Sequence, residues 1–247
     1  MRRGAGIALL GVLTAAGCDR PANPAPPSPS AESASPGKTD WFRPTPDCPP
    51  ARAYRGLPTG SLITSRIVYP DGTKGSTLTS TVVKSEGPLL ELSTHRAFSD
   101  GRKATDPFNR RIALGFLPAG VTGEGERVVS FEPGFEAAIA GLSVGRSVRL
   151  PVQERTAYGG RSRRVRDDYE VELTGCGEML VGTRVEPVRV YRVTVFNRSY
   201  RPGNPPQDTV VRNTSTHYVG AETGWSLREL EGIGGEIVVV KVEKRRG

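Results

Sequence analysis

Residues 131–160 read FEPGFEAAIAGLSVGRSVRLPVQERTAYGG and contain the clearest helix signal of the chain. Pro133 stands where the first turn of a helix tolerates proline. Gly141 and Gly145 limit the helix at its C-terminal end, and a strand is expected at 147–152. Between these bounds, one apolar stripe forms at the helical spacings i, i+3, i+4 and i+7, namely Phe135, Ala138, Ile139 and Leu142.

Outward from this segment the pattern is mostly β. The chain of 247 residues contains 30 Gly and 21 Pro, so long helices are not expected. Loops are expected at 118–126, 161–166 and 201–208, and a short helix at 226–230. Alternating or β-branched runs predict strands at 62–69, 77–84, 89–92, 112–114, 169–173, 188–196 and 236–242.

The N-terminus predicts export. Arg2 and Arg3 precede an apolar run that ends at Gly17 and is too short to span a bilayer. Cys18 follows directly, and the junction resembles a bacterial lipobox, in which this cysteine is lipidated. We therefore expect a lipoprotein signal peptide at 1–17, a lipid anchor at Cys18 and a location in the cell envelope, facing the periplasm or the exterior. The alternative is an ordinary secretory signal.

Residues 18–50 predict a tether, because ten prolines lie between Pro21 and Pro50 and little apolar surface is present to bury. Beyond the leader two thiols remain, Cys48 and Cys176. Outside the cytoplasm they favour either a disulfide or two independent thiols.

The composition excludes several functions. With 3 Cys and 2 His, a multi-Cys/His zinc site is not expected, and no metal or cofactor is implied. The net charge is +8, but export separates the chain from nucleic acid, so no nucleic-acid partner is expected. His95 and His217 are isolated in the sequence, which is typical of structural or exposed histidines.

The quoted segment resembles the FKBP family of peptidyl-prolyl isomerases. The motifs Pro-Gly-Phe-Glu at 133–136, Val-Gly at 144–145 and Ala-Tyr-Gly at 157–159 follow the family spacing without a gap, and 169–173 resembles its last strand. The resemblance implies a mostly β (α+β) fold: an antiparallel sheet wrapped on one short helix, with an additional β-rich C-terminal segment. The expected organisation is a strand pair at 51–83, an FKBP-like domain at 84–177 and the C-terminal segment at 178–247.

The family likeness also implies site residues. The catalytic set is Phe135 on the pocket floor, the hydroxyl of Tyr158, the ring of Tyr169 and, by a one-residue shift of register, the carboxylate of Asp106. Substrate binding is implied for Phe131, Glu132 and Ile112.

The function implied is a membrane-tethered isomerase that acts on proline-containing exported polypeptides. An X–Pro bond rotates over a barrier of about 18–20 kcal/mol, which a dry aromatic pocket can lower without a nucleophile or a metal. Two alternatives remain open: a non-enzymatic envelope lipoprotein with the same fold, used for binding or structure, and a β-sandwich unrelated to FKBPs.

Overall fold

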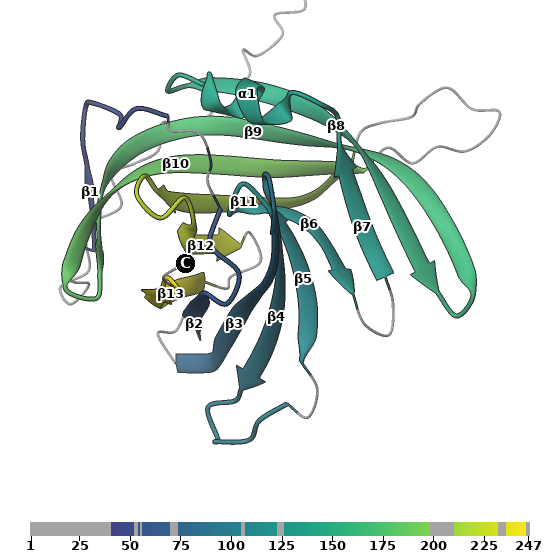
Figure 1. Ribbon diagram of the computed structural model, residues 1–247. Helices are drawn as coiled ribbons and strands as arrows, with labels where there is room; N and C mark the ends of the chain where they lie inside the picture. Colours follow the sequence, from purple (N-terminus) through teal and green to yellow (C-terminus); the bar gives the residue numbers. More distant parts are fainter. Residues whose placement is uncertain are drawn as a thin grey trace, which may run out of the picture. The chain divides into compact units, whose positions relative to one another are not determined.

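The computed structural model describes residues 41–51, 54, 56–69, 74–104, 107–122, 126–197, 210–231 and 236–245. Within them the chain forms one short helix, α1 (Phe135–Ala140), and thirteen strands (Figure 1). The strands are β1 (Phe42–Pro44), β2 (Leu62–Val68), β3 (Lys74–Glu86), β4 (Leu89–Ala97), β5 (Phe108–Ala113), β6 (Leu117–Thr122), β7 (Glu126–Phe131), β8 (Arg146–Tyr158), β9 (Arg161–Val181), β10 (Arg184–Asn197), β11 (Val210–Gly220), β12 (Ser226–Glu231) and β13 (Glu236–Glu243).

All strands join one antiparallel sheet, in the order β1-β9-β10-β11-β12-β13-β2-β3-β4-β5-β6-β7-β8. A further pairing of β8 with β9 closes the sheet, so β2 to β13 form a closed barrel of twelve strands. β1 is an extra strand that pairs with the C-terminal part of β9. Closure removes the exposed edges that an open sheet of this size would present.

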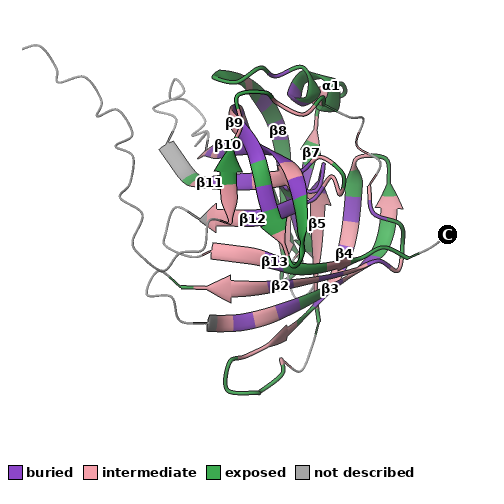
Figure 2. Cartoon of the chain, turned by 90° about the vertical axis from the view of Figure 1, so that its left-hand side faces the viewer, coloured by how far each residue is buried: buried purple, intermediate pink, exposed green. Residues whose placement is uncertain are grey.

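Alternation along the strands builds the interior. Figure 2 shows buried and less buried residues following one another along several strands, as expected when one face of a strand points inward. Two buried apolar clusters result. The first centres on β8, β9 and β10 and includes Leu150, Val171 and Val193. The second centres on β3, β4 and β12 and includes Leu92 and Leu227.

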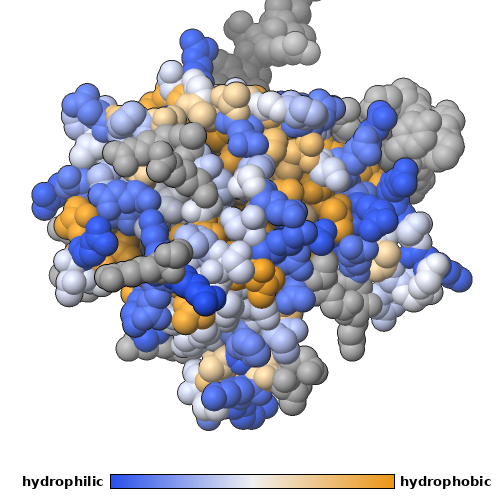
Figure 3. Space-filling model, viewed as in Figure 1, coloured by the Kyte–Doolittle hydropathy of each residue, from blue (hydrophilic) through white to orange (hydrophobic). Residues whose placement is uncertain are grey.

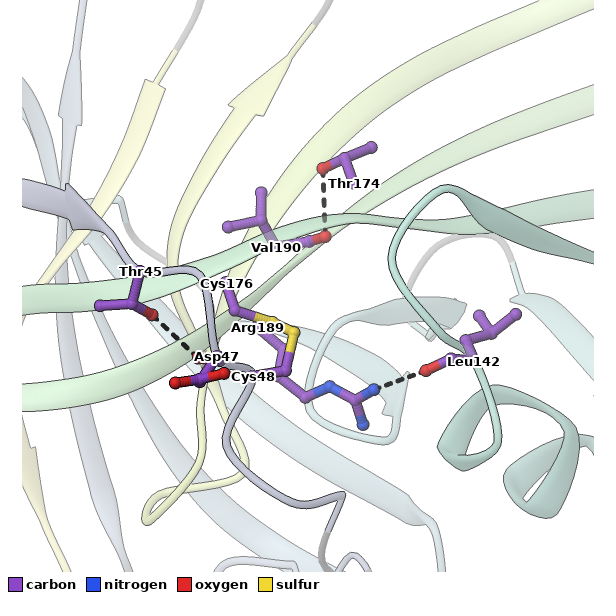
Figure 4. Close-up of a disulfide and its surroundings, with 8 residues drawn as sticks. All are labelled: Thr45, Asp47, Cys48, Leu142, Thr174, Cys176, Arg189 and Val190. Carbon is purple, nitrogen blue, oxygen red and sulfur yellow. Dashed lines mark hydrogen bonds between the residues drawn. A yellow bond between two sulfur atoms is a disulfide. The ribbon is translucent and has the colours of Figure 1, made fainter.

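A disulfide fastens the segment after β1 to the barrel. Cys48 and Cys176 are bonded, and they are separated by 128 positions in the sequence (Figure 4). The same segment continues to Leu57, which is buried in the second cluster. Beside the disulfide, the guanidinium of Arg189 donates a hydrogen bond of 2.8 Å to the carbonyl oxygen of Leu142, just beyond α1 (Figure 4).

The expected fold, a sheet wrapped on one short helix, is wrong. The helix signal itself is confirmed, because α1 begins at Phe135 and ends at Ala140, but Ile139 is its one buried residue. A helix of about one and a half turns cannot cover the inner faces of twelve strands. The side chains on those faces instead pack against one another. Of the residues that the structure describes, none lies in a helix long and apolar enough to cross a lipid bilayer.

Three local predictions are also wrong. The expected helix at 226–230 is strand β12, which β11 and β13 hold on both sides. The expected loop at 118–126 contains most of β6 and the start of β7, and the expected loop at 161–166 is the beginning of β9. In each case pairing with the adjacent strands decides the backbone conformation, and the composition of the segment alone does not reveal those partners.

The body segments expected at 51–83, 84–177 and 178–247 contribute strands to the same sheet. β2, from the first, pairs with β13, from the last, and β3 pairs with β4 of the middle segment.

Candidate functional site

The barrel wall opens between β6 and β7. These strands share two register pairs, Gly120 with Val128 and Val121 with Arg127, whereas β7 pairs with β8 along its whole length. A side chain at Gly120 would collide with the carbonyl oxygen of Arg127, 2.2 Å from an added Cβ, so glycine permits this close crossing. Beyond the crossing the two strands diverge, and no described strand pairs with residues 129–131 on the side away from β8.

A cleft of about 340 Å³ occupies this opening. Figure 3 shows apolar surface bordered by hydrophilic groups over the region where β6 and β7 lie in Figure 1. Two ion pairs stand at the rim: Lys84 with Glu86 at 2.9 Å, and Arg111 with Glu91 at 3.6 Å. The lining residues are Lys84, Glu86, Pro88, Leu89, Leu90, Glu91, Arg111, Ala119, Val128, Val129, Ser130, Phe131 and Phe135.

Aromatic rings form the floor beside β7. The rings of Phe131 and Phe135 stack with centroids 4.7 Å apart, and Phe131 meets the edge of Tyr169 at 5.7 Å. The hydroxyl of Tyr169 donates a hydrogen bond of 3.2 Å to the carbonyl oxygen of Pro118 on β6. Tyr169 therefore bridges the divergent strands from inside and holds the opening in a fixed geometry.

A second cleft, of about 420 Å³, lies beside the end of β7 and is lined also by residues of β8 and β9. It shares Ser130 and Phe131 with the first cleft, and its remaining walls are more polar. They are formed by Glu132, Pro133, Pro151, Val152, Gln153, Arg166, Asp167 and Asp168. The end of β7 therefore borders two clefts, the first mainly apolar and the second more polar.

A partly buried ion pair joins β7 to β8: the carboxylate of Glu154 is buried, and the side chain of Arg127 is partly exposed. Arg127 donates a hydrogen bond of 2.8 Å to the carboxylate of Glu154 on β8. Burial disfavours the charge of Arg127, but this hydrogen bond and the nearby carboxylates, Glu154 and Asp167, raise its pKa above the ordinary value. The pair holds β7 against β8, because moving Arg127 away would leave the buried carboxylate of Glu154 without its cation.

The structure brings together part of the site expected from the sequence. Phe131 and Phe135 line the first cleft, Glu132 lines the second, and Tyr169 contacts the ring of Phe131.

Other expected site residues lie elsewhere. Ile112 packs against the second core cluster. Tyr158 stands at the turn between β8 and β9 with 75% of its surface exposed. Asp106 and Cys18 lie outside the described residues.

The assignment to FKBP-type isomerases, and with it the catalytic mechanism, is wrong. The mechanism requires the rings of Phe135 and Tyr169 and the hydroxyl of Tyr158 to line one dry pocket. Instead, Tyr158 lies at the exposed end of a hairpin, and the hydroxyl of Tyr169 is bonded to Pro118. The matching motifs encode a helix, a strand and a tight turn, and a barrel uses that local sequence as readily as an FKBP-like sheet does.

A serine–histidine pair, which the sequence did not indicate, lies inside the barrel. The side chains of Ser215 and His217 hydrogen-bond at 2.8 Å, and Ser226 contacts the other ring nitrogen at 3.3 Å. This arrangement resembles a nucleophile with its base. However, His217 is 1% exposed, and burial lowers its pKa from 6.5 to about 3, so the imidazole is a very weak base. We interpret it as structural.

No family model and no curated protein matches the sequence. Several solved structures resemble it, among them the following three. The hypothetical lipoprotein YmcC from Escherichia coli (K12) has a TM-score of 0.45 and 13% identity, covering 75% of this chain and 85% of that chain. A presumed exported protein with a YmcC-like fold from Bacteroides fragilis has 0.43 and 10%, covering 78% and 99%. A presumed lipoprotein from Parabacteroides distasonis has 0.45 and 10%, covering 80% and 100%. At 10–13% identity these likenesses assign no function to this chain.

Proposed function

We propose that this chain is a non-enzymatic lipoprotein of the cell envelope, anchored at Cys18, that binds an extended polypeptide segment in the cleft beside β7. The observation that carries the proposal is the divergence of β6 and β7, which leaves one edge of β7, at residues 129–131, without a strand partner among the described residues and next to an apolar cleft. The location is the one expected from the leader, and the three similar structures are described as lipoproteins or exported proteins.

The two strands that border the opening differ in what they offer a ligand. On β6, Pro118 has no N–H, and its carbonyl oxygen already accepts the hydrogen bond from Tyr169. On β7, residues 129–131 have a strand partner only in β8 among the described strands. An extended segment would therefore add to β7, as peptides add to the open edges of other sheets.

The cleft supplies side-chain selectivity. Leu89 and Phe131 provide apolar surface, and a volume of about 340 Å³ suits a bulky apolar side chain with part of its backbone. In each ion pair at the rim the positive and the negative charge cancel, so the rim adds little net charge. We expect ligands with alternating apolar residues and no strong charge.

Replacing Leu89 by serine is expected to weaken binding of a labelled, neutral hexapeptide of alternating threonine and phenylalanine by about fivefold to tenfold. Leu89 is 39% exposed in the free protein, and a bound peptide would cover it. The loss corresponds to the burial of part of one leucine, roughly 1 kcal/mol. Fluorescence anisotropy measures the dissociation constant.

Leu180→Ser is the matched control, because Leu180 is 49% exposed but does not line the cleft. A peptide N-methylated at alternate residues tests the main-chain contacts, since it retains the side chains but loses amide donors. Equal binding by both leucine variants would contradict the site, and unchanged affinity of the methylated peptide would contradict strand addition.

Replacing Cys18 by serine is expected to move the protein from the membrane fraction to the soluble fraction of the envelope. A lipid chain contributes about 0.8 kcal/mol for each buried methylene group, and serine cannot accept it. Fractionation and mass spectrometry of the mature N-terminus measure the outcome. The anchor is refuted if the wild-type protein carries no acyl chains.

A further inference from the structure

Among the described strands, the tip of the β8–β9 hairpin is flanked on one side only, because β7 follows β8 as far as Ala157 whereas β10 ends earlier beside β9. The two strands pair from Arg146 with Leu173 to Tyr158 with Arg161. β10 stops at Asn197, opposite Asp167, so residues 161–166 of β9 are paired with β8 alone among the described strands. Figure 1 shows this end of the hairpin projecting beyond β10.

This projecting end is strongly basic. Residues 153–166 contain five arginines and one acidic residue, Glu154, which is buried and paired with Arg127. Arg155 pairs with Glu126 at 2.9 Å. The other four arginines are exposed, and none forms an ion pair within the part of the chain that the structure describes. They are Arg161, Arg163, Arg164 and Arg166.

The arginines lie on both faces of the hairpin, with an aromatic ring at its end. By register, Arg164 is opposite Arg155 on one face, and Arg163 is opposite Thr156 on the other. Tyr158 precedes the turn formed by Gly159 and Gly160, and 75% of its surface is exposed. Charges on both faces suit a surface that surrounds the tip, rather than a partner that docks on one side.

We propose that the tip of the β8–β9 hairpin inserts into the headgroup layer of an anionic phospholipid membrane. Tyrosine rings accumulate at the membrane interface, where the ring is partly buried and the hydroxyl stays hydrated. Arginines on both sides then reach lipid phosphates, to which the guanidinium binds in a bidentate manner. The membrane is the one to which the proposed anchor attaches the chain, but the contact itself does not require the anchor.

The test uses the exported Cys18→Ser protein, which has no acyl chain, so failure of the anchor and failure of this contact are distinguished. Sedimentation with vesicles of phosphatidylcholine, alone or with about a third phosphatidylglycerol, measures binding. We expect binding to the anionic vesicles only, weakening as salt screens the charges. Replacing the four exposed arginines by glutamine should weaken binding by at least about a hundredfold, and Tyr158→Ser by severalfold.

Four exposed arginines outside the hairpin provide the matched control, replaced together by glutamine: Arg43, Arg102, Arg146 and Arg184. This variant loses the same charge and should retain most of the affinity. Both quadruple variants should melt close to the parent, because they change exposed side chains. Equal loss in the two variants, equal binding to neutral vesicles, or tighter binding to a soluble polyanion such as heparin than to the anionic vesicles would each overturn the proposal.

Discussion

Replacing both Cys48 and Cys176 by serine is expected to lower the free energy of unfolding by about 2–5 kcal/mol, which is a large part of the stability of an ordinary domain. The disulfide joins positions 128 residues apart, so it closes a long loop in the unfolded chain and lowers the conformational entropy of that state. It also fixes the segment that leads to Leu57 in the core. Urea unfolding, followed by the fluorescence of Trp41 and Trp225, measures the difference.

Reductant separates the disulfide from the effect of the serines. The wild-type protein should lose stability when reduced, whereas the double variant should be insensitive to reductant. Both proteins carry Cys18→Ser, so that no other thiol reacts. An unfolding midpoint that is the same with and without the disulfide would show that the native strands alone determine the position of this segment.

Local features of the fold could be predicted from the sequence. The spacing of Phe135, Ile139 and Leu142 defines α1, and the alternation at 188–196 defines most of β10, because each pattern depends on neighbouring residues. Closure of the barrel depends on pairs such as Ile63 with Val242 and Val148 with Val171. Nothing in either strand alone specifies the partner, so the sequence was equally compatible with an open sheet wrapped on a helix.

The candidate site likewise has a part that the sequence predicted and a part that it did not. Phe131 and Phe135 were expected to line a pocket, and both line the cleft beside β7. The cleft exists because β6 and β7 diverge, and the residues behind this divergence, Pro118 and Gly120, lie in a stretch predicted to be a loop. Glycine and proline indicate a loop when read locally, but here they shape the edge of a strand. Tyr158 was misplaced because its motif encodes a tight turn without specifying what the turn approaches.

Acidification from pH 7 to pH 5 is expected to remove about 2 kcal/mol of stability through His217. Burial lowers the pKa of this imidazole to about 3 in the folded protein, against 6.5 in the unfolded chain. Between these values the unfolded chain binds a proton that the folded protein does not. The contribution of His217 is therefore complete above about pH 6.5 and decreases as the pH falls toward 3.

Other titratable groups lie near His217, so its contribution to stability must be measured as a difference between two proteins. Glu229 lies opposite it on β12, and burial raises the pKa of that carboxyl, so acidification favours the folded state through Glu229. Tyr191 lies opposite on β10, and burial raises its pKa further above this range, so it stays neutral. Comparing the parent with His217→Gln at each pH cancels the contributions that the two proteins share.

The second histidine of the chain supplies the control. His95 is exposed on β4, so His95→Gln is the matched histidine substitution outside the barrel interior. His217→Gln retains a hydrogen-bonding group for Ser215 but has no proton to bind, so its stability should fall less steeply than that of the parent between pH 7 and pH 5. Parallel curves for parent and His217→Gln would mean that the imidazole is protonated as readily in the folded barrel as in the unfolded chain. Water would then have to reach the interior beside Ser215, which would contradict the interpretation of the serine–histidine pair as a buried structural contact.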